Sequence, residues 1–204
     1  MTDKKSLVEL LPDLIAEEFH LPINTEGMLR ITEEQIQAAC RWVEIRTKQS
    51  VPSFCFSIDK PRKIGEGDPV FPFFNPKEAG ICSKNDAFLV CQKNQQIYVL
   101  LIELKSNNLG KYLNQLHAAR SFFQFIIARI RLYYQCSHNL DKIQFRGLLF
   151  SCRRTPDKGT AKHKKVEFND RNGLLVTEQE CNQSYNLTRF FEKKPAKITQ
   201  TKSR

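Results

Sequence analysis

Residues 97–105 read IYVLLIELK, an almost unbroken apolar run that carries Glu103 and Lys105 near its end. Such a run predicts a β-strand that is buried on both faces of a sheet. Because successive side chains of a strand alternate between its faces, Glu103 and Lys105 lie on the same face. Two opposite charges at the end of so apolar a strand make this end a candidate site.

A second apolar strand precedes this one, and together they predict a β-hairpin. Residues 85–92 and 97–105 are joined by residues 93–96, KNQQ, whose length and composition fit a hairpin turn. A turn centred on this linker places position 86 opposite position 103. Asp86 and Glu103 are therefore expected side by side on one face, with Cβ atoms about 5 Å apart.

Adjacent carboxylates repel each other, and more strongly where they are partly desolvated. A divalent cation removes the repulsion, and Mg²⁺ or Mn²⁺ prefers hard oxygen ligands such as Asp86, Glu103 and the backbone carbonyl of Leu104. Lys105 would then stand beside the metal, where an ammonium group orients an attacking water or stabilises charge on a phosphorane-like transition state. The alternative is that these charged residues simply flank strands in solvent and form a surface ion pair.

The remaining chain predicts an α/β domain with one mixed sheet flanked by helices. We divide it into an N-terminal helical extension at 1–31, a domain at 32–191 and a basic, disordered tail at 192–204. The order from residue 32 is helix, strand, strand, strand, helix, strand, with an extra C-terminal hairpin. The expected elements are helices at 32–49 and 111–135, strands at 53–58, 85–92, 97–105 and 143–151, and a hairpin made by 165–168 and 173–177.

Asp86, the hairpin and the sequence Glu103-Leu104-Lys105 together resemble the PD-(D/E)xK nuclease superfamily, whose fold is restriction-endonuclease-like. The αβββαβ order over about residues 32–151 resembles the common core of that superfamily. The resemblance implies that Asp86 and Glu103 are metal ligands, that Lys105 is the catalytic lysine and that the reaction is phosphodiester hydrolysis. One departure is Asn85, which stands where the motif has proline.

Two further features follow from the same resemblance. Many members place a polar residue on the helix after the lysine strand, and Gln115 fits that position as an accessory catalytic residue. Some members carry another glutamate on the first core helix, and Glu33, Glu34 and Glu44 remain alternatives for it.

The charge of the chain points to a polyanionic partner. The formal net charge is +10 and the pI is near 9.3, which favours nucleic acid over a membrane surface. Residues 151–204 hold 13 Lys and Arg against 6 Asp and Glu. A solubilising surface with a frayed tail is the alternative reading. The candidate phosphate contacts are Arg153, Arg154, Lys158, Lys162, Lys164 and Lys165.

The seven cysteines have no CxxC or CxH spacing, so we expect buried, reduced thiols, and a zinc site has little support. The N-terminal segment lacks the uninterrupted apolar core of a signal peptide. No apolar run reaches the roughly 18–20 residues that span a bilayer. These features predict a cytoplasmic, reducing location.

Taken together, the sequence predicts a nuclease that depends on Mg²⁺ or Mn²⁺ and acts on DNA, or less favourably on RNA. Such domains are expected in repair, recombination or anti-phage defence, beside an ATPase, another subunit or a second copy. The rival is a nuclease-fold module with weak or lost cleavage that binds nucleic acid or an acidic protein. The chain has no Gly-rich phosphate loop and no GxSxG arrangement, which argues against ATP, dinucleotide or serine-hydrolase chemistry.

Overall fold

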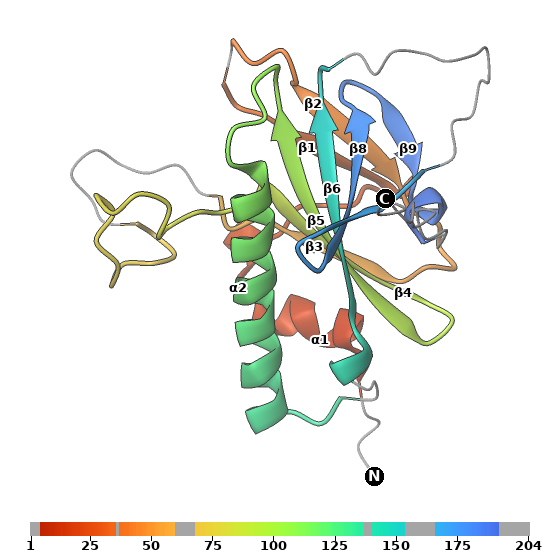
Figure 1. Cartoon of the computed structure of the whole chain (residues 1–204). Helices are drawn as coiled ribbons and strands as arrows, with labels where there is room; N and C mark the ends of the chain where they lie inside the picture. The colour runs from red at the N-terminus through yellow and green to blue at the C-terminus, as the bar shows by residue number, and fades with distance from the viewer. Residues whose placement is uncertain (1–4, 36, 60–67, 137–139, 154–165, 192–204) are drawn as a thin grey trace, which may run out of the picture.

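The computed structural model describes residues 5–35, 37–59, 68–136, 140–153 and 166–191. It has mixed sheets and two α-helices, which confirms the α/β class (Figure 1). The helices are α1 (Leu7–Leu14) and α2 (Tyr112–Tyr133), and 3-10 turns cover Glu17–Phe19, Leu140–Lys142 and Leu187–Phe190. The strands are β1 (Met28–Thr32), β2 (Trp42–Arg46), β3 (Ser53–Phe56), β4 (Ala87–Lys93), β5 (Gln96–Lys105), β6 (Gln144–Ser151), β7 (Asn169–Arg171), β8 (Leu174–Glu180) and β9 (Ser184–Asn186).

The main sheet has six strands in the order β3-β4-β5-β6-β8-β7. β3, β4 and β5 form an antiparallel meander, whereas β5, β6 and β8 are parallel neighbours. Helix α2 makes the crossover from β5 to β6, which is how parallel neighbours are usually connected. The sheet is mixed because it joins these two kinds of connection.

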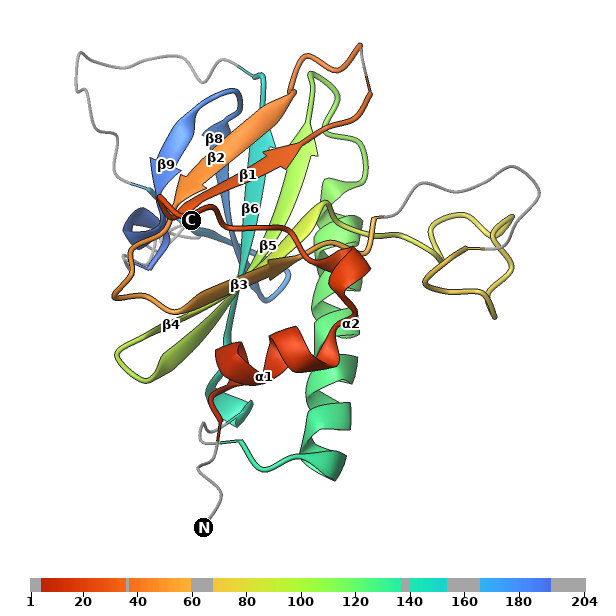
Figure 2. The same cartoon turned by 180° about the vertical axis from the view of Figure 1, so that it is seen from behind.

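A smaller sheet and the two helices cover the main sheet. β1, β2 and β9 form a three-stranded sheet, and Figures 1 and 2 show it on the side of the main sheet away from α2. Helix α1 begins at a capping box, in which Ser6 and Glu9 exchange side-chain to backbone hydrogen bonds. In the part of the chain that the structure describes, no helix combines the length and apolar character that crossing a bilayer requires.

The core lies on both faces of the central strands. Val99 and Leu101 of β5 pack in the cluster that contains residues of α1 and α2, whereas Leu100 and Ile102 pack in the cluster that contains β1 and β2. All four side chains are fully buried. The prediction that β5 is covered on both faces is therefore confirmed. Gly147 of β6 permits the close approach of α2, since an added Cβ would lie 2.8 Å from a methyl carbon of Leu116.

The β4–β5 hairpin has the predicted register. Its two-residue turn consists of Asn94 and Gln95, with φ of 49° and 61°, and the pairs run from Lys93–Gln96 to Ala87–Ile102. The backbone N–H of Asp86 donates to the carbonyl oxygen of Ile102 at 3.1 Å. Asp86 thus lies one position beyond the last regular pair, just before β4 begins, and next to Glu103.

The predicted helix at 32–49 is wrong. β1 ends at Thr32, a turn follows, and β2 occupies Trp42–Arg46. Glu33 Oε1 accepts from the backbone N–H of Gln35, so the residues at the start of the expected helix form a local turn instead. The segment WVEIR alternates with period two, and its pairing with β1 and β9 outweighs the helical signal.

The predicted C-terminal hairpin exists, but its turn is displaced. The turn was expected at residues 169–172. β7 occupies Asn169–Arg171 instead, and the turn falls at Asn172 and Gly173. Both residues have positive φ, and Asn-Gly is the sequence that a two-residue hairpin turn favours most. β7 and β8 extend the main sheet at the far side of β6. The tail at 192–204 lies outside the described residues.

We expect Gln95→Gly to stabilise the protein. Gln95 adopts a left-handed conformation that costs a side-chain-bearing residue about 1 kcal/mol and costs glycine little. The melting temperature should rise by roughly 2–4 °C in a chain of this size. Gln95→Ala is the matched control and should gain nothing. Equal gains for glycine and alanine would show that the turn is not responsible.

Candidate active site

Asp86, Glu103 and Lys105 meet where β4 begins and β5 ends. One carboxylate oxygen of Asp86 accepts a hydrogen bond from the backbone N–H of Leu104. Lys105 Nζ lies 2.6 Å from Glu103 Oε1. The structure therefore brings together the predicted acids and the predicted lysine, on the face of the sheet that α2 covers.

Glu103 is the most unusual residue of this group, because its side chain is 0% exposed. Its Oε1 is paired with Lys105, whereas its Oε2 has no hydrogen-bond partner among the residues described. Burial, and next the charge of Asp86, raise the pKa of Glu103 to about 8, although Lys105 acts in the opposite direction.

Asp86 is partly buried and is also perturbed. Burial raises its pKa to about 6, while the N–H of Leu104 and the charge of Lys105 lower it. Glu33 and Asp59 contribute smaller upward effects. The two neighbouring acids therefore both hold protons more tightly than isolated carboxyl groups, and a bound cation would displace those protons.

A cleft of about 340 Å³ opens beside Asp86, and its wall includes Glu33, Glu34 and Asp59. Glu33 and Glu34 follow β1, and Asp59 follows β3. Burial raises the pKa of Asp59, and the charges of Glu33 and Glu34 add to this effect. The cleft is therefore strongly acidic within a chain whose formal net charge is +10.

Of the three alternatives for a further glutamate, two lie in this cleft. Glu33 and Glu34 line it from a turn rather than from the expected helix. Glu44 lies in β2, where it pairs with Arg30 at 3.1 Å and accepts from Ser184. Sequence reasoning missed Asp59, whose position depends on the pairing of β3 with β4.

Gln115 contacts the backbone before Asp86 rather than the acids. Its Nε2 donates to the carbonyl oxygen of Lys84 at 3.1 Å. Asn85 is fully buried, and its Nδ2 donates to the carbonyl oxygens of Ala87 and Ile102. These amides hold the segment that carries Asp86 against α2 and β5. Gln115 is therefore a positioning residue in this structure.

A second buried ion pair supports the same segment. Lys84 Nζ lies 2.9 Å from Asp68 Oδ2, and both side chains are less than a tenth exposed. Asp68 belongs to the loop that stands out from the body of the molecule in Figure 1. The backbone N–H groups of Val70 and Phe71 also donate to its other oxygen. The pair anchors this loop beside the site, and no local sequence pattern indicates it, because the pairing partners lie 16 positions apart in an irregular segment.

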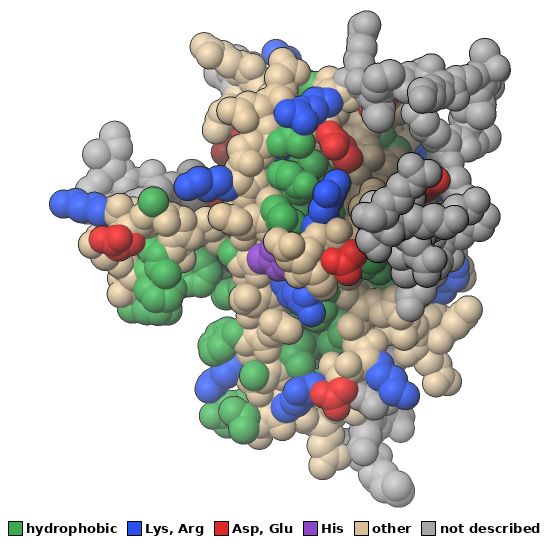
Figure 3. Space-filling model, in the orientation of Figure 1, with side chains coloured by type: hydrophobic (Ala, Val, Ile, Leu, Met, Phe, Trp, Pro, Cys, Tyr) green, Lys and Arg blue, Asp and Glu red, His purple; other side chains and the backbone are tan. Residues whose placement is uncertain are grey.

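Of the six predicted phosphate contacts, Arg153 is the one that the structure describes. It is exposed at the end of β6, and its Nε donates to the carbonyl oxygen of Asn107, shortly after β5. Arg153 therefore lies at the same edge of the sheet as Lys105. Arg154, Lys158, Lys162, Lys164 and Lys165 fall outside the described residues. On the face in Figure 3, the described basic side chains are scattered among acidic ones.

The comparisons with known proteins add no family to these observations. No family model matches the chain, and no curated protein or solved structure matches it. The functional argument therefore depends on the geometry and electrostatics of this site.

We expect Glu103→Gln to stabilise the metal-free protein at high pH. A carboxyl group whose pKa is raised by folding favours the folded state when protonated, so its contribution falls as the pH rises from about 4 towards 8. Glutamine imitates the protonated form. At pH 8.5 the variant should gain about 1 kcal/mol or more, roughly 3 °C in melting temperature.

The measurement is thermal unfolding in chelator between pH 5 and pH 8.5. The melting temperatures of the two proteins should be closest at pH 5 and should diverge progressively as the pH rises to about 8. Glu78→Gln, in an exposed loop, is the matched control and should show no such divergence. A Glu103→Gln variant that is less stable than wild type at pH 8.5 would contradict the assigned electrostatics.

Proposed function

We propose that the chain is a nuclease that depends on Mg²⁺ or Mn²⁺ and hydrolyses phosphodiester bonds. The observation that carries this proposal is Glu103, a fully buried carboxyl group beside Asp86, whose Oε1 is paired with Lys105 and whose Oε2 has no hydrogen-bond partner among the described residues. Two neighbouring carboxylates served by one ammonium group keep an excess of negative charge, which is costly where it is buried. A hard cation offsets this cost by binding both acids, and the donor set consists of oxygen atoms that suit it.

Each residue of the site has a role in this proposal. Asp86 and Glu103 hold the metal, and the carbonyl oxygen of Leu104 is a further candidate ligand. When bound, the metal supplies positive charge that stabilises the transition state and promotes proton loss from the attacking water. Lys105, which remains 24% exposed, orients that water or stabilises charge on the phosphoryl oxygens. Gln115 fixes the backbone ahead of Asp86 through the carbonyl oxygen of Lys84.

The strand connections support a restriction-endonuclease-like core. The meander β3-β4-β5, the crossover helix α2 and the parallel strand β6 reproduce most of the αβββαβ order. Residues 32–49 do not supply the first helix of that order. We propose that α1 takes this place, because it packs against β3 and β4, and that β1 and β2 are an insertion.

The substrate in this proposal is DNA, with RNA as the less favoured choice. The net charge of +10 suits a polyanion, and Arg153 stands at the edge of the sheet that carries Lys105. Work beside an ATPase or another subunit, in repair, recombination or anti-phage defence, remains an expectation from the resemblance. A nuclease-fold module that binds nucleic acid without cutting it is the second candidate, since charge alone would support binding.

The test is cleavage of single- and double-stranded DNA and of RNA with Mg²⁺, Mn²⁺ or chelator. We expect metal-dependent cleavage whose rate rises between pH 6 and pH 8, as Asp86 and Glu103 lose protons. Lys105→Ala and Glu103→Gln should lower the rate by about 100-fold or more. Lys142→Ala removes an exposed lysine near the opposite end of β6 and should leave the rate unchanged.

Two outcomes would overturn the enzymatic proposal. Cleavage that survives Lys105→Ala and Glu103→Gln would come from another site or from a contaminant. Salt-sensitive binding of nucleic acid without cleavage, in any of these metals, would favour the binding module instead.

A further inference from the structure

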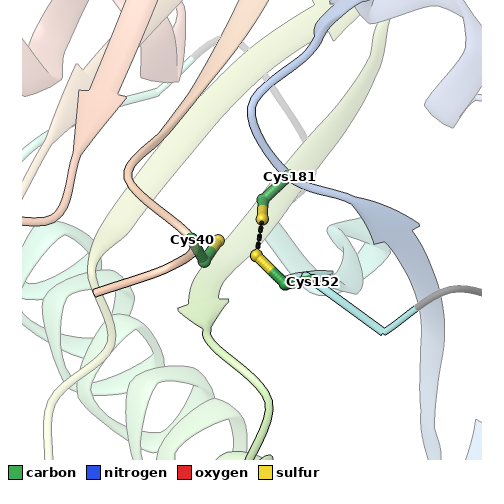
Figure 4. A group of neighbouring side chains, drawn as sticks. All are labelled: Cys40, Cys152 and Cys181. Carbon is green, nitrogen blue, oxygen red and sulfur yellow. Dashed lines mark hydrogen bonds between the residues drawn. The ribbon is translucent and has the colours of Figure 1, made fainter. Parts of the chain in front are cut away.

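Three cysteines from distant parts of the chain converge on one point. Cys40 precedes β2, Cys152 follows β6 and Cys181 follows β8. Their sulfur atoms all lie within 4.8 Å of one another, and the sulfurs of Cys152 and Cys181 are 2.8 Å apart. Figure 4 shows the three side chains pointing toward one another from three segments of backbone.

The backbone around these thiols is fixed by hydrogen bonds. The N–H groups of Ala39 and Cys40 donate to Ser106 Oγ at 3.0 and 3.3 Å. The N–H of Cys181 donates to the carbonyl oxygen of Ser151 at 3.0 Å. The cluster is therefore built onto the ends of β5 and β6 rather than placed on free loops.

Asn182 ties two of the three segments directly together. Its Oδ1 accepts from the backbone N–H groups of Arg41 and Trp42, and its Nδ2 donates to the carbonyl oxygen of Ala39. The residue after Cys181 thus holds the residues on either side of Cys40. Such support for the backbone of the ligands is typical of metal sites, where partners beyond the first shell orient the donor atoms.

We propose that Cys40, Cys152 and Cys181 bind a Zn²⁺ ion. Zinc takes thiolate ligands in tetrahedral geometry at about 2.3 Å, which places the sulfurs about 3.8 Å from one another. The observed separations are 2.8 Å for one pair and at most 4.8 Å for the others, so none exceeds that value by more than about 1 Å. Zinc binding would bring the three sulfurs to equal distances from the ion. Cys152 is partly exposed, so the fourth position is open to water or to an added ligand.

This zinc site is distinct from the acidic site. Cys40 and Cys181 belong to the same packed cluster as Leu104 and Phe150, so they lie on the face of the sheet opposite to Glu103 and Lys105. Thiolates select zinc and disfavour Mg²⁺, whereas carboxylates do the reverse. The inference therefore does not rest on the proposed nuclease activity. A bound ion would join the Cys40 segment to the ends of β6 and β8.

A disulfide between Cys152 and Cys181 is the competing explanation of their contact. It would use two of the three thiols and would leave Cys40 beside them without a role. Ordinary burial of small apolar side chains is the other explanation, but it does not require three sulfurs to meet. Cys55 and Cys91 show what such burial looks like, since they are buried in neighbouring strands.

The test uses the full chain, purified without a histidine tag under a non-thiol reductant. Elemental analysis should find about one zinc per chain. Cobalt substitution should give the sulfur-to-cobalt charge-transfer absorption of a thiolate site. Cys152→Ser should lower the affinity for zinc at least tenfold, as should Cys40→Ser. Cys91→Ser, a buried cysteine of β4, is the matched control and should keep the metal, as should Glu103→Gln.

The zinc content and the cobalt absorption of the wild-type protein test the proposal even where a serine variant fails to fold. Wild type that contains no zinc and develops no charge-transfer absorption with Co²⁺ would overturn the proposal. A Cys152–Cys181 disulfide found by mass spectrometry in freshly prepared, zinc-free protein would also overturn it. Loss of nuclease activity in Glu103→Gln with zinc retained would show that the two sites are independent.

Discussion

The antiparallel register of β4 and β5 is the constraint on which the site depends. It places Asp86 in the position next to the Ala87–Ile102 pair, before β4 begins, and so beside Glu103. A shift of one residue would move Asp86 to the opposite face of the sheet. The two-residue turn at Asn94 and Gln95 sets the register, and apolar packing on both faces of β5 fixes it. The interior that stabilises the fold is thus also what desolvates Glu103.

Residues at the end of β5 contact functional groups on both faces of the sheet. On one face, Glu103 and Lys105 form an ion pair beside Asp86. Just beyond the strand, Ser106 accepts two backbone hydrogen bonds from the segment that carries Cys40. The sheet therefore separates the oxygen donors of the acidic site from the sulfur atoms of the cysteine cluster, because the two groups lie on its opposite faces. The two sets suit different metals, so one ion is not expected to compete for both.

The sequence predicted the parts of the fold whose signals are local. The hairpin followed from two apolar runs and a short polar linker, and α2 and β6 followed from their periodicity. The helix expected at 32–49 failed because the pairing of β2 with β9 joins residues about 140 apart in the chain, which no local pattern reports. Asp59 and the three thiols were missed for the same reason. Residues that converge from separate segments have no characteristic spacing, so the absence of CxxC and CxH patterns does not bear on a cluster of this kind.

In the proposed function, the distribution of charge gives a bound metal a second role, which is to admit the phosphate. Glu33, Glu34, Asp59 and Asp86 line the cleft, and this acidic wall repels a phosphodiester despite the positive charge of the whole chain. A divalent ion held by Asp86 and Glu103 would reverse the local sign and let the phosphate approach. Arg153, at the same edge of the sheet, offers a contact for a neighbouring phosphate. Binding of nucleic acid near this cleft should therefore depend on the metal, whereas binding elsewhere should depend on charge alone.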